Sequence, residues 1–122
     1  MPIITITGLP SDTPQTILQK IEEEITKAVV GMEVLEIDES HMAFRFQPDM
    51  RNLMVGSDIF VDAVLFDEPV RTPEVRTEFA ERIEGVIHKF FPDSWVEVLS
   101  WPFDRSWGFA LQKPLERIGM MA

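Results

Sequence analysis

The chain has 122 residues, of which 45% are hydrophobic and 26% charged, so one domain over residues 1–122 is long enough to bury a core. Its formal net charge of -10 repels phosphate groups, so neither nucleic acid nor an anionic membrane is expected as a partner. The absence of cysteine excludes disulfides, thiol nucleophiles and iron–sulfur sites. The N-terminus lacks a secretory signal pattern, and we expect a cytoplasmic protein.

The first half predicts a β-α-β unit over about residues 2–48. Residues 3–7 are β-branched and end at Gly8, which predicts a strand. Thr13 and Pro14 predict the start of a helix, with the threonine hydroxyl as its cap and proline in its first turn. Gly31 predicts a left-handed stop for that helix. Residues 42–47 then alternate between apolar and polar before Pro48, as in a half-buried strand.

The second half repeats this plan over about residues 58–101. Residues 59–66 predict a strand, and Thr72 and Pro73 repeat the cap and first-turn proline of a helix. Helical spacing of apolar residues continues to Phe91 and Pro92, and residues 95–101 predict the returning strand. Residues 102–122 then form a C-terminal extension.

Two such units predict an α/β fold, or α+β by some schemes, with a four-stranded mixed sheet. Each crossover helix makes the two strands of its unit parallel. Because each helix has a single apolar stripe, both helices must cover the same sheet face. The other face stays bare, and we expect it to carry Ile4, Ile6, Val64 or their neighbours. An uncovered face with apolar content predicts oligomerisation.

Several short segments occur in an order that resembles the tautomerase superfamily, to which macrophage migration inhibitory factor belongs. Pro2 directly follows the initiator Met and precedes a β-branched strand. The other segments are 9–14, Gly31, 47–49, 56–57 and the aromatic stretch 106–109. Residues 60–67, with the sequence FVDAVLFD, look closest to an uncharacterised bacterial branch of the superfamily.

The resemblance implies a fold and a chemistry. In such families Met1 is removed, and the exposed amine of the proline, here Pro2, acts as a general base in keto-enol tautomerisation, without a cofactor. It also implies a homotrimer and a small carboxylate substrate. The alternative is that Pro2 only rigidifies a strand, and if Met1 is retained, the nitrogen is an amide without a basic lone pair.

Such a reaction also needs a cation that stabilises the enolate, and the sequence leaves open which residue supplies it. The cytokine-like members place a lysine after the glycine that ends the first helix, whereas Met32 follows Gly31 here. Arg71 lies at the pseudo-equivalent point of the second repeat to an arginine of the small bacterial tautomerases, and could act from a neighbouring subunit. Its alternative is a solvated cation. Arg45 alternates with two phenylalanines and is expected on the bare face, as a carboxylate anchor or as part of a structural ion pair.

Aromatic side chains gather near the end of the last predicted strand. Trp101, Phe103 and Trp107 flank Arg105, a third candidate to bind substrate. They form either a pocket wall or a subunit contact, and the interpretation that the tail contacts a neighbouring subunit is favoured.

No metal or cofactor is predicted, because His41 and His88 lie on different elements without a set of carboxylates at metal-site spacing. Two functions follow from the sequence. One is a cofactor-free isomerase with Pro2 as the base and one of the three arginines as the anchor. The other is a non-catalytic oligomeric binding or scaffolding protein of the same fold.

Overall fold

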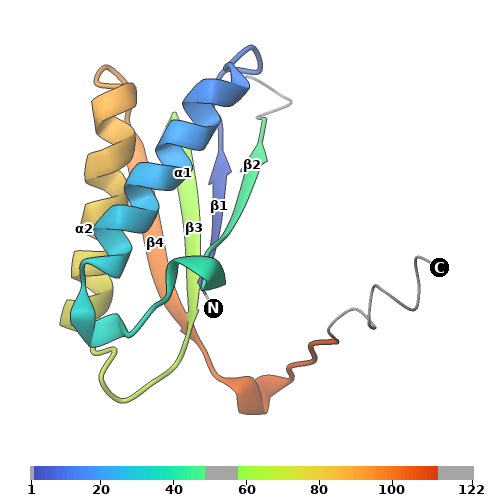
Figure 1. Cartoon of the computed structure of the whole chain (residues 1–122), viewed down its shortest axis with the longest axis vertical. Helices are drawn as coiled ribbons and strands as arrows, with labels where there is room; N and C mark the ends of the chain where they lie inside the picture. Colours follow the sequence, from blue (N-terminus) through green and yellow to red (C-terminus); the bar gives the residue numbers. More distant parts are fainter. Residues whose placement is uncertain (1, 49–57, 113–122) are drawn as a thin grey trace.

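The computed structural model describes residues 2–48 and 58–112. Sequence features at Met1, Asp49, Gly56, Ser57 and in the last ten residues lie outside this part of the chain. The main elements follow in chain order in Figure 1: β1 (Ile3–Thr7), α1 (Gln15–Val30), β2 (Ala43–Gln47), β3 (Ile59–Phe66), α2 (Pro73–Phe90) and β4 (Val96–Phe103). Short 3-10 helices are η1 (Glu33–Leu35), η2 (Glu39–His41) and η3 (Arg105–Trp107).

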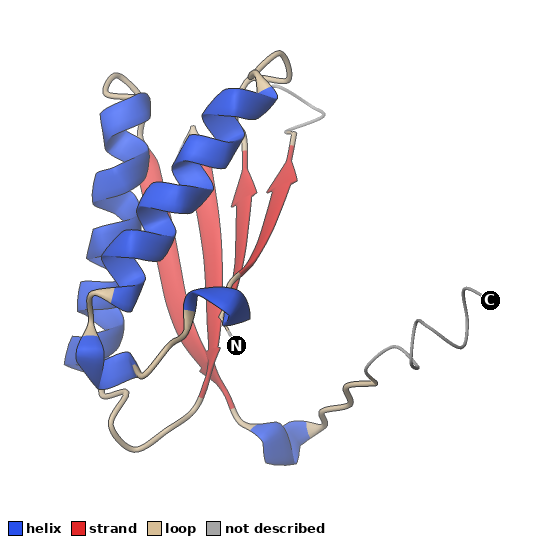
Figure 2. Cartoon of the chain, viewed as in Figure 1, coloured by secondary structure: helices blue, strands red, loops and turns tan. Residues whose placement is uncertain are grey.

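The four strands form one mixed sheet in the order β2-β1-β3-β4. Strand β1 is parallel to β2 and β3 is parallel to β4, while the two central strands β1 and β3 are antiparallel. Both helices lie on one face of this sheet (Figure 2). The prediction of two β-α-β units in a four-stranded mixed sheet is therefore confirmed.

The core lies between the helices and one sheet face. Alternate residues of the two central strands are fully or almost fully buried there, namely Ile4, Ile6, Ile59, Val61, Ala63 and Leu65. The helices contribute Ile21, Ile25 and Val29 from α1 and Phe79, Ile83, Val86 and Ile87 from α2. Each large side chain buried in this way contributes about 1.5–3 kcal/mol relative to exposure. Within the described residues, neither helix is long and apolar enough to cross a bilayer.

The bare sheet face differs from the expectation at β1. Ile4 and Ile6 were expected there but are fully buried beneath the helices. Because side chains alternate along a strand, this places Ile3 and Thr5 on the bare face instead. Val64 lies on that face, as expected, because the residues before and after it are buried beneath the helices.

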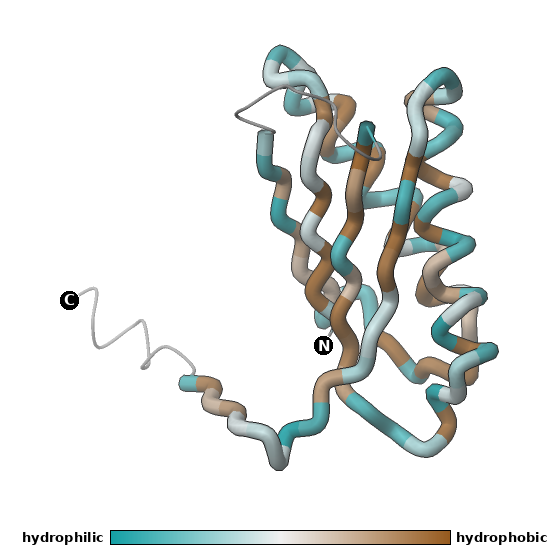
Figure 3. The backbone as a smooth tube through the Cα atoms, turned by 180° about the vertical axis from the view of Figure 1, so that it is seen from behind, coloured by the Kyte–Doolittle hydropathy of each residue, from teal (hydrophilic) through white to brown (hydrophobic). Residues whose placement is uncertain are grey.

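Seen from behind, apolar and polar residues follow one another along the strands of the sheet (Figure 3). Ile3, Leu99 and Trp101 remain 45%, 49% and 40% exposed in the single chain. Apolar area of this size on the uncovered side of a sheet is the surface that a second subunit would bury.

The two helices begin differently, although each is preceded by Thr-Pro. At α2 the prediction is confirmed: the hydroxyl of Thr72 accepts a hydrogen bond from the amide of Val75 at 3.3 Å, and Pro73 is the first helical residue. At α1 it is wrong. The hydroxyl of Thr13 instead donates to the carbonyl of Pro10 at 2.6 Å, and the helix begins after Pro14 without a side-chain cap.

The predicted left-handed stop at Gly31 is also wrong. Gly31 has φ -63°, a right-handed conformation, and its amide donates to the carbonyl of Lys27. The chain reverses later, at Glu36, where φ is 52° after η1. Strand β4 extends to Phe103, two residues further than expected, because it stays paired with β3 up to Phe66.

The Thr72 cap gives a test of this fold. Replacing Thr72 by Ala leaves the first amides of α2 without their acceptor, so the free energy of unfolding should fall by about 1 kcal/mol in urea denaturation. Thr77→Ala is the matched control, since the Thr77 hydroxyl only donates to the carbonyl of Pro73 within the same helix. It should change stability by less than about 0.5 kcal/mol. Equal losses in both variants would contradict the role of the cap.

Candidate functional site

Pro2 lies buried at the start of β1, one of the two central strands. Its carbonyl accepts a hydrogen bond from the amide of Ala43 at 3.1 Å, which joins it to β2. Because β1 and β3 are antiparallel, with Ile3 opposite Val64, the start of β1 lies at the sheet end where β3 finishes. Pro2 therefore shares this end with Phe66 and with the loop that leads into α2.

Arg71 lies in that loop, and its guanidinium group is committed to backbone carbonyls. One terminal nitrogen donates to the carbonyl of Phe66 at 2.8 Å and the other to the carbonyl of Leu35 at 3.0 Å. The residue is only 9% exposed, so the expectation of a solvated cation is wrong. The reason is that its two terminal nitrogens reach a carbonyl at the end of β3 and one in η1, so the side chain is enclosed between these two segments.

Both positively and negatively charged side chains lie near Arg71. Burial lowers the pKa of Arg71 from its ordinary value, and the nearby Arg105 lowers it further, while Glu68 and Glu36 oppose the shift. Arginine nevertheless remains protonated at neutral pH. The buried Nε of Arg71 has no hydrogen-bond partner among the described residues. Arg71 therefore keeps a fixed positive charge at this end of the sheet, next to two carboxylates.

Arg105 lies beside the same end of the sheet and is exposed. Its guanidinium carbon stands 4.0 Å from the centre of the Phe66 ring and 5.8 Å from that of Phe109. The two phenylalanine rings meet edge to face at 5.0 Å. Stacking on aromatic rings leaves the N–H groups of an arginine available to a ligand.

The turn that presents Arg105 is held locally. A carboxylate oxygen of Asp104 accepts a hydrogen bond from the amide of Ser106 at 2.8 Å, and this bond lowers the pKa of Asp104. Trp107, at the end of η3, packs edge to face on Phe103 at 5.8 Å but is 67% exposed. After η3 the chain leaves the body of the domain (Figure 1).

Arg45 and Trp101 lie on the bare face. The neighbouring Phe44 and Phe46 pack against the core, so Arg45 points to the other side, as expected, and one of its nitrogens donates to the carbonyl of Phe44 at 3.3 Å. The indole nitrogen of Trp101 donates to a carboxylate oxygen of Asp62 at 2.5 Å. Arg45 and Asp62 both pair with Thr5 of β1, so these polar groups form one row across the sheet.

The structure thus brings three of the predicted site residues to one end of the sheet, namely Pro2, Arg71 and Arg105. Arg45 lies on the bare face, in the middle of β2. Trp101 shares that face, opposite Val64.

Sequence reasoning missed three groups that contact the predicted site residues. They are the ring of Phe66 and the carbonyl of Leu35 at this end of the sheet, and the carboxylate of Asp62 on the bare face. Only Asp62 carried a signal, as the one acidic residue inside an apolar strand. A carbonyl that receives a distant arginine leaves no mark in the sequence, since every residue has one.

Comparisons with known proteins support one fold. No protein-family model matches the chain, and no curated protein matches it. Among solved structures, the R7 fused 4-OT wild type asymmetric trimer matches with a TM-score of 0.73 and 13% identity over 96% of this chain and 98% of that chain. Malonate semialdehyde decarboxylase matches with a TM-score of 0.67 and 10% identity over 91% of each chain. The chain has the tautomerase fold.

A third solved structure with this fold is a domain of unknown function, DUF1904, from Sebaldella termitidis. It has a TM-score of 0.56 and 15% identity over 90% of this chain and 95% of that chain. The predicted likeness to an uncharacterised bacterial branch is thereby supported. Identities this low establish the tautomerase fold alone, and the activities of these proteins are their own.

The buried guanidinium of Arg71 gives a test of the site. Arg71→Met leaves the carbonyls of Phe66 and Leu35 without donors, so the free energy of unfolding should fall by about 2–4 kcal/mol in urea denaturation. Arg71→Lys should recover only part of this loss, because one ammonium cannot reproduce the two-pronged geometry. Lys20→Met, an exposed cation on α1, is the control and should stay within about 0.5 kcal/mol. A similar small effect at Arg71 would contradict its structural role.

Proposed function

We propose that this protein is a cofactor-independent tautomerase of a small carboxylate substrate, with Pro2 as the general base. The observation that carries the proposal is the position of Pro2, buried at the end of the sheet that also holds Arg71 and Arg105. Fused 4-OT and malonate semialdehyde decarboxylase share this fold, and the latter has been studied with a mutant in which its proline at the first position is alanine. Decarboxylase and hydratase activities belong to that protein.

In the proposed reaction, Pro2 has lost Met1 and carries a free secondary amine. Burial disfavours the charged form of an amine, so the nitrogen is available as a base near neutral pH. It takes a proton from the carbon next to the substrate carbonyl, and the electron pair of that bond moves to form an enolate. The same proton, now on the ammonium, is returned to the enolate oxygen to give the enol. No electrons or atoms are exchanged with a cofactor.

The arginines divide the remaining work. Arg71 has both terminal nitrogens bonded to backbone carbonyls, so its contribution is a fixed positive charge that stabilises the enolate at a distance. Arg105 is exposed and stacks on the rings of Phe66 and Phe109, which leaves two N–H groups to bind the substrate carboxylate. Trp107, which lies in η3 with Arg105, would contact the substrate next to that arginine. Arg45 and Trp101, on the bare face, would serve a site only where a second subunit brings them to Pro2.

The second candidate function is a non-catalytic oligomeric binding or scaffolding protein. Met32 favours it, because the position that the cytokine-like relatives fill with lysine is here an apolar side chain with only 4% exposure. Retention of Met1 would also favour it, because the nitrogen of Pro2 would then remain an amide.

Solvent-proton exchange separates the two functions. A small 2-keto acid, 2-oxobutanoate, is incubated in deuterated buffer with protein whose intact mass shows that Met1 is absent, and loss of its C3 proton signal is followed by NMR. Pro2→Ala should slow the catalysed exchange by about 10²-fold or more. The rate should rise with pH as the amine loses its proton. Arg105→Met should raise KM more than it lowers kcat, because it anchors the substrate.

The matched variant for that assay is Lys20→Met, which removes an exposed cation from α1. It should leave the exchange kinetics unchanged if Arg105 is the anchor. Exchange that is equal with and without Pro2, or native protein that still carries Met1, would contradict the tautomerase and favour the scaffolding function.

We further propose that the bare face is buried in a homotrimer, in line with the fused 4-OT neighbours, which are described as trimers. Light scattering should then give three times 14.0 kDa, about 42 kDa. Val64→Lys places a charge on the bare face and should lower the mass. Gln19→Lys, on the exposed side of α1, is the control and should not. A monomer at all concentrations would contradict the trimer.

A further inference from the structure

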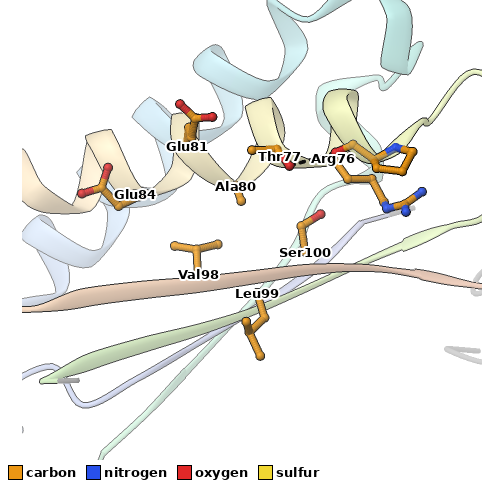
Figure 4. A pocket seen from close by; sticks show the side chains of 9 residues that line it. Arg76, Thr77, Ala80, Glu81, Glu84, Val98, Leu99 and Ser100 are labelled. Carbon is orange, nitrogen blue, oxygen red and sulfur yellow. Dashed lines mark hydrogen bonds between the residues drawn. The ribbon is translucent and has the colours of Figure 1, made fainter. Parts of the chain in front are cut away.

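A groove of about 610 Å³ lies between α2 and β4, away from Pro2. Strand β4 is an edge strand, because β3 is its only neighbour in the sheet order. Figure 4 shows Ala80 of α2 and Val98 and Ser100 of β4 turned into the space between the helix and the strand, while Leu99 points to the opposite face. The floor of the groove is therefore the free edge of the sheet.

The backbone of β4 presents unused hydrogen-bonding groups to this groove. The carbonyls of Trp95 and Phe103 accept the amides of Ile59 and Asp67, both at 2.9 Å, so the odd-numbered residues of β4 face β3. In a parallel pair, the N–H and C=O of one residue point to the same side, and successive residues alternate. The peptide groups of residues 96, 98 and 100 accordingly point outward, where an added strand would pair with them.

Two side chains delimit the edge that is open to pairing. Pro102 has no N–H, so the outward ladder loses its donor there. Ser100 lies two residues earlier, and its hydroxyl oxygen is buried without a hydrogen-bond partner among the described residues. An unpaired hydroxyl on the groove wall is a site for a polar side chain of the occupant.

The helix wall of the groove is acidic. Glu81 and Glu84 line it, at a spacing that places their side chains about 5–6 Å apart on one helix face. Among residues 2–48 and 58–112, the one ion pair within 4.0 Å joins Arg82 to Glu78, so neither groove carboxylate has a cationic partner. Their carboxylates turn away from the strand (Figure 4), so only a long basic side chain would reach them from the sheet edge.

At the other end of the groove, Arg76 is already engaged. One of its terminal nitrogens donates to the carbonyl of Arg71 at 2.6 Å. Because a carbonyl is neutral, Arg76 keeps its positive charge at that end, and the acidic part of the groove is the end that carries Glu81 and Glu84.

We propose that this groove binds an extended, basic peptide segment of a partner protein, which adds to the sheet as a fifth strand beside β4. In such a strand, alternate side chains face the helix about 7 Å apart. A lysine or arginine would face Glu81 and Glu84, and a serine or threonine would face Ser100. The residue between them would lie beside Leu99 on the other face and would be apolar. A second copy of this acidic chain is a poorer occupant, because its net charge is -10.

The test uses full-length protein and a labelled peptide with the sequence TVKVSVKVT, which reads the same in both directions and so fits either strand orientation. Binding is followed by fluorescence anisotropy, with a control peptide in which glutamates replace the lysines. The lysine peptide should bind and the glutamate peptide should not. Affinity should also fall between about 50 mM and about 300 mM salt, because the charged contacts are exposed.

Two variants of the protein distinguish the contribution of the glutamates on α2 to peptide binding from that of the β4 backbone. The double variant Glu81→Gln/Glu84→Gln should weaken binding roughly tenfold, whereas Glu23→Gln/Glu24→Gln on α1, with the same change in net charge, should leave it unchanged. Val98→Pro removes an outward amide but no bond to β3, so it should abolish binding with the fold retained by circular dichroism.

Amide hydrogen exchange of wild-type protein keeps the test decisive if the proline variant does not fold, since bound peptide should slow exchange at Val98 and Ser100. Equal binding of both peptides, no binding of either, or unchanged exchange at these amides would overturn the proposal. A lower oligomer mass for the Val98→Pro variant would overturn it as well, because the edge would then belong to a contact between copies. None of these outcomes depends on catalysis at Pro2.

Discussion

Both helices bury their single apolar stripes against one face of the sheet, and this shared core determines the rest of the structure. Phe79 and Ile83 of α2 and Ile21 and Ile25 of α1 are fully buried against the alternate residues of the central strands. Because two helices suffice for only one face, the other face must remain uncovered in the single chain. The same packing leaves both edge strands beside the outer sides of their helices, and the groove at β4 follows from it.

The end of the sheet that holds Pro2 depends on a second interaction, the buried guanidinium of Arg71. It joins the carbonyl of Phe66 at the end of β3 to that of Leu35 in η1, so the chain around Pro2 is held from two sides. The ring of Phe66 in turn carries Arg105. One arginine is therefore a structural cation and its neighbour an accessible one, and this division of roles is the basis of the proposed carboxylate site.

The core and the peptide groove are both formed by α2 and β4, but by different sides of these elements. The inner side of α2 is apolar and rigidly packed, whereas the groove side carries Glu81 and Glu84. Strand β4 bonds to β3 through every second residue, and the backbone N–H and C=O groups of the intervening residues point away from β3. A catalytic site at the sheet end and a docking edge at β4 would thus be separate surfaces, and occupation of one would leave the other open.

By itself, the sequence determined the element order, the four-stranded mixed sheet and the packing of both helices on one common face, because apolar periodicity shows that each helix has a single buried side. It also placed Arg45 on the bare face, through the alternation with Phe44 and Phe46. Only the tertiary structure decided the role of Arg71, the start of α1 after Pro14 and the neighbours of Arg105. In each case the deciding partner is a backbone carbonyl or a ring brought near by folding, and such contacts have no signature in local sequence.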